Sequence, residues 1–478
     1  MKTKRRQLVA FVFLLTILTT IACSVPPRAP DLGGLYTKLA QNEDPYRNPV
    51  ILIPGILGSK LVDRPSDVIV WGTFGFGNAN PNNAEGARLV ALPITRGKKF
   101  SELHDNVIPT DTLDKVVISF GGYPLVLNTY AYILGVLGVG GYRDQQQAVQ
   151  DVVDWGDLHF TCFQFAYDWR RDLVESARKL DGFIKEKKQY VEQELERRFG
   201  ITDHDVKFDI VAHSMGGLVA RYYLRYGTQD LPADGSFPQL TWTGSRYVSN
   251  VLMVGTPNGG SMDAMLKLVE GYHPALLLPF YPPAVIGTMP SLYEILPRSR
   301  HGLLWDNQGR PVDDIFDPEL WRKNGWGLAD AKQDKVLRML LPEEASPEKR
   351  TQTAFEYLTK VLNRAKQFTA AMDVPARPPE SLHLYLVAGD AEDTDKSARV
   401  GKNGKLTVTE KGPGDAVVLR SSALMDERGP DRQTSRLISP IGWKQVFFLF
   451  SDHRNITNDP AFTDNLLYIL LESPRDSQ

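Results

Sequence analysis

A serine flanked by small residues lies in the middle of the chain. The segment A-H-S-M-G-G, residues 212–217, directly follows the apolar run Phe208–Ala212 and directly precedes the helical pattern Leu218–Leu224. A sharp strand-to-helix turn of this kind raises a serine hydroxyl above a sheet, and small neighbours permit the turn. The usual motif begins with glycine, for which Ala212 is a small replacement. The pattern predicts that Ser214 is a nucleophile; the alternative is a glycine-rich turn whose serine only caps the helix.

A serine hydroxyl needs a base to take its proton, and in folds with this turn the base is a histidine late in the chain. His453 follows the last expected strand, Gln445–Phe450, and precedes a helical pattern from about Asp464 to Leu471. That position is where the base is expected. We therefore predict that His453 activates Ser214.

The remaining histidines near or after the serine have plainer interpretations. His383 lies within a strand pattern, which predicts a core or sheet-face residue. His273 and His301 fall in an inserted segment, where we expect exposed surface positions. His213 adjoins Ser214 in sequence and is expected to point away from it.

The positioning elements are short β-branched runs that alternate with longer helical patterns. The expected strands are Val50–Ile53, Thr161–Ala166, Phe208–Ala212, Val248–Val254, Leu382–Val387 and Gln445–Phe450. The clearest helix is Leu173–Phe199, with Gly200 as its stop. Such alternation predicts a mostly parallel central sheet flanked by helices. Together with the serine turn it indicates the α/β-hydrolase fold.

Two intervals, about 71–155 and 261–380, interrupt the alternation and are expected to be cap or lid insertions. The second contains the apolar, proline-rich stretch 275–286, which includes Leu277 and Phe280. Prolines make this stretch unsuited to a regular helix or a central strand. A flexible lid over an apolar cleft has this composition, and so does an ordinary buried connection.

The first residues differ in kind from the rest of the chain. Basic residues precede an apolar run from Leu8 to Leu18, and Ala22 and Cys23 follow. The uncharged run is too short for a membrane span, so residues 1–22 are predicted to be a secretory signal peptide. The segment T-I-A-C-S, residues 20–24, resembles a bacterial lipoprotein box, which implies lipidation of Cys23.

This resemblance implies an exported lipoprotein of the bacterial cell envelope, attached to the membrane surface by its lipid. Ser24 follows the cysteine, which by resemblance to Gram-negative lipoproteins implies the outer membrane. Residues 23–48 are rich in proline and polar groups and are expected to be the lipidated N-terminus and a linker. The other cysteine, Cys162, lies in an apolar stretch and is interpreted as a buried small side chain.

Composition sets the remaining limits. The chain has 478 residues, 42% of them apolar, and a formal net charge of −2. We expect one catalytic domain, residues 49–478, with insertions. No basic run is interleaved with aromatic residues, so nucleic acid is excluded as a partner.

Five further motifs extend along the body. They are P-G-I-L-G-S-K-L at 54–61, Y-D-W-R at 167–170, G-T-P-N-G-G at 255–260, G-D-A-V-V-L-R-S at 414–421 and H-R-N at 453–455. Together with the serine turn they resemble the lecithin:cholesterol acyltransferase and lysosomal phospholipase family. The resemblance implies a serine-dependent lipid acyl hydrolase or acyltransferase that forms an acyl-enzyme at Ser214.

The resemblance also implies roles for individual residues. Asp415 would orient His453 and stabilise its imidazolium form. Backbone amides of Leu57 and Met215 would bind the oxyanion of the tetrahedral intermediate. The residues Tyr167–Arg170 would support the sheet edge and the floor of the pocket. No metal or organic cofactor is expected.

Alternatives remain for the acid and for the activity. Asp390 directly follows an expected strand, where many hydrolases carry the acid, and the family resemblance favours Asp415. The acidic run Asp390, Glu392, Asp393 and Asp395 is interpreted as a solvated loop, with a weak calcium site as the alternative. The other functions considered are a serine esterase or amidase for non-lipid substrates and a catalytically silent binding lipoprotein.

Overall fold

The computed structural model describes residues 29–75, 77–120, 123–274, 278–428 and 436–474. The predicted signal peptide and Cys23 lie outside these residues. None of the helices in these ranges combines the length and the apolar character that crossing a membrane requires.

Six parallel strands form the central sheet, in the order β15-β12-β10-β9-β1-β8. Their bounds are β1 Val50–Ile53, β8 Cys162–Gln164, β9 Phe208–His213, β10 Val248–Val254, β12 His383–Gly389 and β15 Trp443–Leu449. All six correspond to strands predicted from the sequence. Because the strands are parallel, their carboxyl ends meet at one edge, where α/β proteins build their sites. The strand β9, which leads to the serine turn, lies between β1 and β10.

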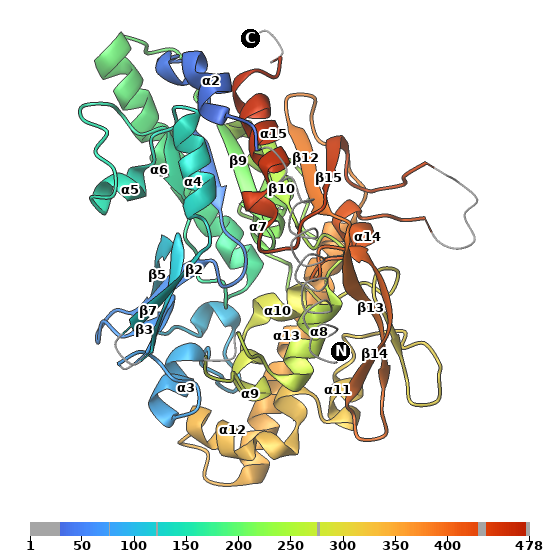
Figure 1. Ribbon diagram of the computed structural model, residues 1–478. Coiled ribbons are helices and arrows are strands. Elements are labelled where there is room, and N and C mark those ends of the chain that lie inside the picture. The colour runs from blue at the N-terminus through green and yellow to red at the C-terminus, as the bar shows by residue number, and fades with distance from the viewer. Residues whose placement is uncertain (1–28, 76, 121–122, 275–277, 429–435, 475–478) are drawn as a thin grey trace, which may run out of the picture.

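Side chains that alternate along the strands divide the core between the two faces of the sheet. On one face Leu52, Val211 and Leu252 belong to a cluster with the helices α4 (Ala131–Val139) and α15 (Pro460–Leu471). On the other face Ile53 and Met253 pack with α6 (Leu173–Phe199) and α7 (Gly216–Tyr226). The sheet is thus covered by helices on both faces, as the predicted fold class requires (Figure 1).

The helix α6 has the bounds that the sequence predicts. Asp172 caps its start by accepting a hydrogen bond from the Glu175 amide at 3.1 Å. Gly200 ends it with a φ of +66°, in the left-handed conformation that suits glycine. Leu180 and Ile184, on its apolar stripe, are fully buried. This helix leads the chain across the sheet and directly into β9.

A helix not predicted from the sequence precedes the sheet. The helix α2 (Leu32–Gln41) lies within the segment 23–48 that was expected to be a linker. Its Tyr36 is buried, and the hydroxyl donates a 2.9 Å hydrogen bond to Asp464 of α15. The folded body therefore begins before residue 49, because one aromatic side chain attaches this short helix to the C-terminal helix.

The interval 71–155 contributes strands to two small sheets and contains several helices. One sheet combines β2 (Ser59–Asp63), β3 (Ile69–Trp71) and β5 (Val107–Thr112), and the other combines β4 (Thr73–Phe74), β6 (Lys115–Phe120) and β7 (Tyr123–Asn128). The helical segments are α3 (Ala84–Val90), a 3-10 turn at Phe100–Glu102, α4 and α5 (Gln145–Val149). Since α4 covers the central sheet, this interval contributes to the core as well as to an insertion.

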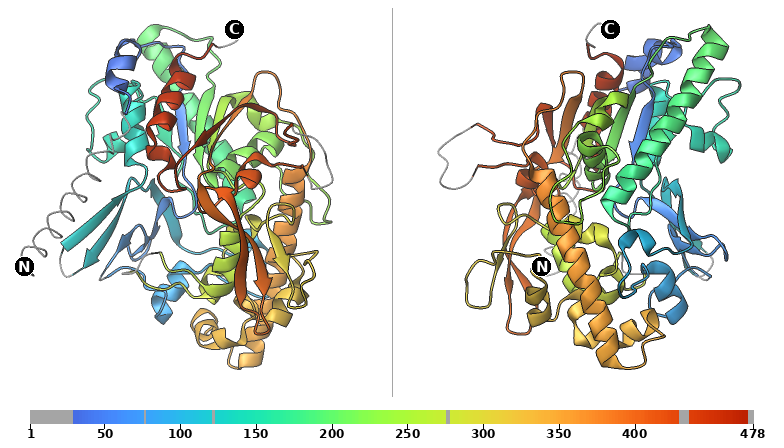
Figure 2. Two further views of the ribbon diagram at one scale, coloured as in Figure 1. Left: turned by 45° about the vertical axis from the view of Figure 1, so that its right-hand side comes forward. Right: turned by 180° about the vertical axis from the view of Figure 1, so that it is seen from behind.

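The interval 261–380 is mainly helical. It contains α8 (Met262–Glu270), α9 (Pro283–Ile286), α10 (Pro290–Glu294), β11 (Leu303–Trp305), α11 (Pro318–Asn324), 3-10 turns at Gly327–Ala329 and Ala331–Gln333, α12 (Asp334–Leu340) and α13 (Pro347–Asp373). The remaining elements are β13 (Glu392–Val400), β14 (Leu406–Gly414), α14 (Arg420–Leu424) and 3-10 turns at Thr243–Tyr247 and Ile456–Asn458. The view from behind in Figure 2 shows α6 and α13 as two long helices on that side of the molecule.

The apolar stretch 275–286 is divided. Residues 275–277, with Leu277, lie outside the described residues. Tyr281 is buried, and its amide and carbonyl pair with those of Tyr272. The residues of α9 are buried as well, whereas Phe280 is 38% exposed. From Tyr281 onward the stretch is a buried connection in this structure.

Two buried arginines fix α13 to the helix that follows the serine. Arg221 donates to the carbonyl of Met372, and Arg225 donates to the carbonyl of Val374. These carbonyls lie at the C-terminal end of α13, where backbone acceptors lack partners within the helix and the helix dipole favours positive charge. The inserted segment is therefore attached to the serine-bearing part of the fold by its longest helix.

Candidate active site

The turn that carries Ser214 is as sharp as the sequence predicts. Ser214 has a φ of +52°, a left-handed conformation that is strained for a residue with a side chain. A Cβ atom at Gly216 would lie 2.5 Å from the carbonyl oxygen of Pro54, and one at Gly217 would lie 2.0 Å from Oγ1 of Thr256. Only glycine fits at these two positions, so the turn can lie directly against the loops after β1 and β10.

Ser214, His453 and Asp415 come together at the carboxyl edge of the sheet. The Ser214 Oγ lies 2.9 Å from His453 Nε2, and His453 Nδ1 lies 2.8 Å from Asp415 Oδ2. All three residues are buried. Asp390, the alternative acid, instead pairs with Arg420 at 3.3 Å. The arrangement allows the serine to give its proton to a histidine that a carboxylate orients.

The backbone holds the Asp415 side chain in place. Its Oδ1 accepts hydrogen bonds from the amides of Val417 at 3.0 Å and Val418 at 2.6 Å, which leaves Oδ2 for the histidine. The next residue, Ala416, has a φ of +73°, and its amide donates to Thr394 Oγ1 at 2.9 Å. The turn thus fixes the direction in which the carboxylate points.

The acidic run 390–395 is not the solvated loop that we expected. Most of it forms the start of β13, which pairs antiparallel with β14. Within it Thr394 supports the Asp415 turn, and Asp395 lies 3.7 Å from Lys411. The carboxylates in this run hid its strand pattern from a reading of the sequence. The strand forms because β14 pairs with it along its whole length. Across the described residues, no group of three or more histidine, cysteine or carboxylate side chains is placed to hold a metal ion.

The two predicted oxyanion donors are Met215, which directly follows the serine, and Leu57, in the loop after β1. Leu57 has a φ of +62°, and its carbonyl accepts a 2.8 Å hydrogen bond from the Trp71 indole. Met215 directly precedes α7. In the part of the chain that the structure describes, neither amide donates a hydrogen bond. A Cβ at Gly55 would lie 2.7 Å from Ser214 Cβ, so the loop lies against the serine. Two free amides beside a nucleophile can bind a developing oxyanion.

Three histidines lie apart from the triad. His273 is exposed, as expected, and His383 begins β12, with Nδ1 3.3 Å from Asn250 Oδ1. The expectation of an exposed His301 is wrong. It is 3% exposed, and burial lowers its pKa to about 3. The His301 ring packs against Gly259. A Cβ atom at Gly259 would lie 2.3 Å from Cδ2 of His301, so only glycine leaves room for the ring.

A tyrosine that no sequence motif indicated also reaches the site. The Tyr130 hydroxyl lies 2.8 Å from His213 Nδ1, and His213 Nε2 lies 3.1 Å from the carbonyl oxygen of His453. His213 thus turns away from the serine side chain, as predicted, and contacts the backbone of the base. Tyr130 lies in the interval that the sequence assigned to an insertion, where nothing in the pattern connects it to the triad.

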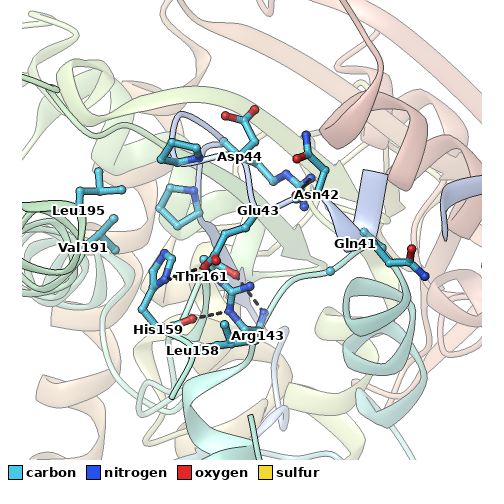
Figure 3. A pocket seen from close by; sticks show the side chains of 15 residues that line it. Gln41, Asn42, Glu43, Asp44, Arg143, Leu158, His159, Thr161, Val191 and Leu195 are labelled. Carbon is cyan, nitrogen blue, oxygen red and sulfur yellow. Dashed lines mark hydrogen bonds and ion pairs between the residues drawn. The ribbon is translucent and has the colours of Figure 1, made fainter. Parts of the chain in front are cut away.

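A separate hollow of about 260 Å³ lies at the opposite edge of the sheet (Figure 3). Its lining includes Pro49 and Thr161, which directly precede β1 and β8. Within it Glu43 lies 3.2 Å from Arg143 and 3.3 Å from His159. Burial, together with the charge of Arg143, lowers the pKa of His159 to about 4. This hollow contains none of the triad residues and is distinct from the candidate active site.

Similarity to known proteins agrees with the motifs. Residues 134–322 match the lecithin:cholesterol acyltransferase family, so the resemblance predicted from the sequence is confirmed. A comparison with curated proteins gave no match.

Several solved structures are similar to this chain. The chain is similar to the Tle4-Tli4 complex, with 15% identity and a TM-score of 0.52, over 88% of this chain and 98% of that chain. It is also similar to lipase 1 from Pelosinus fermentans, with 11% identity and a TM-score of 0.35, over 90% of this chain and 100% of that chain. Phospholipase PlaB from Legionella pneumophila has 11% identity and a TM-score of 0.32, over 73% of this chain and 57% of that chain. At 15% identity the likeness to the Tle4-Tli4 complex concerns the fold alone.

Acid is expected to destabilise the protein through three histidines whose pKa values the fold lowers. His159, His213 and His301 have pKa values lowered from 6.5 to about 4, 3 and 3. Between these values and 6.5 the unfolded chain binds protons that the folded chain does not. The stabilisation of the folded state by these neutral histidines is therefore present above pH 6.5. It is lost as the pH falls toward the pKa values that the histidines have in the folded protein. Lowering the pH from 7 to 5 should cost about 2 kcal/mol of unfolding free energy per histidine.

Urea unfolding at pH 7 and pH 5 measures this loss. His301→Gln should remove about 2 kcal/mol of the pH dependence, whereas the control variant at exposed His273, His273→Gln, should keep the wild-type dependence. An unchanged dependence in His301→Gln would contradict the assignment of a neutral, buried His301.

Proposed function

We propose that this chain, which matches the lecithin:cholesterol acyltransferase family over residues 134–322, is a serine-dependent lipid acyl hydrolase or acyltransferase. The observation that carries the proposal is the hydrogen-bonded series from Ser214 through His453 to Asp415, with distances of 2.9 and 2.8 Å. A buried structural serine has no need of an oriented base. Free amides on both sides of the serine add a feature that acyl transfer requires.

The geometry supports a two-step reaction. In the first step Ser214 Oγ attacks the ester carbonyl, and its proton passes to His453 Nε2. The new oxyanion lies between the amides of Leu57 and Met215, and Asp415 stabilises the imidazolium. The carbonyl re-forms, the ester bond breaks, and His453 gives its proton to the departing alcohol. An acyl group then remains on Ser214.

The second step repeats the first with a new acceptor. Water or an alcohol gives its proton to His453 and attacks the acyl carbonyl, and Ser214 leaves with that proton returned to its oxygen. Water yields hydrolysis and an alcohol yields acyl transfer. The family match supports a lipid ester as the acyl donor. The two outcomes use the same residues, so the acceptor distinguishes them.

Variants of the triad test the proposal. Ser214→Ala should abolish labelling by a fluorophosphonate and hydrolysis of a soluble ester, because it removes the attacking oxygen. Asp415→Asn should lower kcat by about 10³- to 10⁴-fold, since the amide no longer stabilises the imidazolium. Asp390→Asn is the matched control, because Asp390 pairs with Arg420, and should change kcat less than about threefold.

The activity and the labelling are both measured on the purified chain. Labelling of Ser214→Ala at the wild-type rate would contradict the assignment of the nucleophile. A loss of activity in Asp390→Asn with full activity in Asp415→Asn would assign the acid to Asp390 instead.

We further propose that the chain is exported and held at a membrane surface by lipid on Cys23. The support is the sequence of the first residues, with basic residues, an apolar run and a cysteine after Ala22. Such attachment would concentrate the enzyme at a lipid surface. The start of α2 at Leu32 leaves a short connection between the lipid and the folded body.

Processing and location test this attachment. In a Gram-negative host the precursor should be cleaved before Cys23, and the product should be found with the outer membrane. Cys23→Ser should release the protein from the membrane fraction, because no acyl chain can then be attached, while the specific activity toward a soluble ester stays unchanged. Fractionation and mass spectrometry of the N-terminal peptide measure both. An uncleaved chain in the cytoplasm would contradict the proposal.

A further inference from the structure

The hydroxyl of Tyr130 is the centre of a series of hydrogen bonds beside the triad. It accepts from the Gly55 amide at 2.8 Å and lies 2.8 Å from His213 Nδ1. His213 Nε2 lies 3.1 Å from the carbonyl oxygen of His453. A tyrosine hydroxyl has one proton, and here its oxygen already accepts the Gly55 proton. The His453 carbonyl can only accept, so a neutral His213 carries its proton on Nε2, and its Nδ1 accepts the proton of the Tyr130 hydroxyl.

Burial keeps this series neutral and fixed in direction. Tyr130 is buried and His213 is half-buried. Desolvation raises the pKa of Tyr130 and lowers the pKa of His213 to about 3. The Tyr130 hydroxyl thus remains a donor and His213 remains uncharged at any working pH. The centroids of the His213 and His453 rings are 5.1 Å apart. A permanently neutral neighbour adds no positive charge beside the imidazolium that forms on His453.

The series joins three segments that are distant in sequence. Gly55 belongs to the loop after β1 and lies two residues before Leu57, a proposed oxyanion donor. His213 ends β9 and directly precedes Ser214. Tyr130 directly precedes α4, and a Cβ at Gly58 would lie 3.1 Å from its Cε2 atom, so its ring also lies against the same loop.

We propose that Tyr130 and His213 are a positioning pair that fixes the oxyanion loop and the backbone of His453 relative to Ser214. The proposal rests on the proposed function and adds to it two residues that do not touch the reacting atoms. Without the Tyr130 hydroxyl, the Gly55 amide and His213 Nδ1 both lose their buried partner. The Leu57 amide and the His453 ring then lose a constraint on their separation.

Losing this constraint raises the free energy of the transition state. The oxyanion and the imidazolium exist only after the attack has begun, so loosening their donors weakens binding of the transition state more than binding of the substrate. Small displacements of such groups lower rates by up to about 100-fold. A purely structural hydrogen bond predicts a different result, in which stability falls and the remaining folded enzyme keeps its kcat.

Tyr130→Phe removes the hydroxyl and keeps the ring. We expect kcat for a soluble short-chain ester to fall by about 10- to 100-fold with KM within about twofold, and fluorophosphonate labelling to slow by a similar factor. Tyr226→Phe is the matched control. Tyr226 is also buried, and its hydroxyl donates to the Ala371 carbonyl at 2.6 Å, far along α7 from the serine. It should lower Tm to a comparable extent and leave kcat within about twofold.

Substitutions of His213 separate the two hydrogen bonds of that residue. The side chain of Gln approaches the Nε2 position and can still donate to the His453 carbonyl, so His213→Gln should retain more kcat than His213→Ala. In a double-mutant cycle, Tyr130→Phe should cost much less in the His213→Ala background than in the wild type, because the pair acts as one unit. Additive losses in the cycle, or a kcat of Tyr130→Phe equal to that of Tyr226→Phe, would overturn the positioning role.

The wild-type protein separates this inference from the proposed function. If the wild type is neither labelled by a fluorophosphonate nor active toward any ester, the proposed function fails, and the positioning role fails with it. If the wild type is labelled and active while Tyr130→Phe is equally active, the positioning role alone fails. Labelling of the wild type with a selective loss of kcat in Tyr130→Phe supports both.

Discussion

The turn at Ser214 is the constraint on which the site depends. A left-handed φ of +52° at a serine is unfavourable by itself, and the turn persists because its surroundings are fixed. The loop after β1 and the loop after β10 lie so close to Gly216 and Gly217 that no Cβ atom fits there. The loop after β1 also lies against the serine at Gly55, two residues before Leu57. The strain at Ser214 and the proposed oxyanion site therefore depend on the same close approach.

The helix after this turn transmits its position to the rest of the molecule. Arg221 and Arg225 of α7 bind backbone carbonyls at the end of α13, the longest helix of the second insertion. An insertion held in this way cannot move as a whole without leaving buried arginines unpaired, which is costly. Any movement that admits a lipid must then involve smaller parts of the insertion. Tyr281 and α9 are buried, so moving this half of the proline-rich stretch would expose apolar side chains.

The sequence allowed the sheet, the α6 helix, Ser214 and His453 to be predicted, because local patterns determine each of them. Strand runs and the stop at Gly200 are local signals, and a serine turn has a short motif. Asp415 could be assigned only by resemblance. The chain leaves the sheet after β12 and forms the β13–β14 pair before it returns to Asp415, so distance along the chain does not indicate the acid.

Other features depend on tertiary contacts that no local pattern contains. Thr394 supports Asp415 only because β14 turns the acidic run into a strand. His301 is buried because Gly259 leaves space for its ring, and its neighbours in sequence give no sign of this. Tyr130 reaches the triad because α4 packs on the central sheet, although the interval around it resembles an insertion. Each case couples residues that lie far apart in the chain.

The central claim is that Ser214 carries an acyl group taken from a lipid. The most direct measurement is to mix the chain with phospholipid vesicles, stop the reaction in acid within the first turnover, and analyse the peptides by mass spectrometry. The account predicts a peptide containing Ser214 whose mass is increased by one fatty acyl group, and its absence when Ser214 is replaced by alanine. Release of fatty acid by the wild-type chain with the acyl group found on another residue, or with no acylated peptide at any time point, would contradict it.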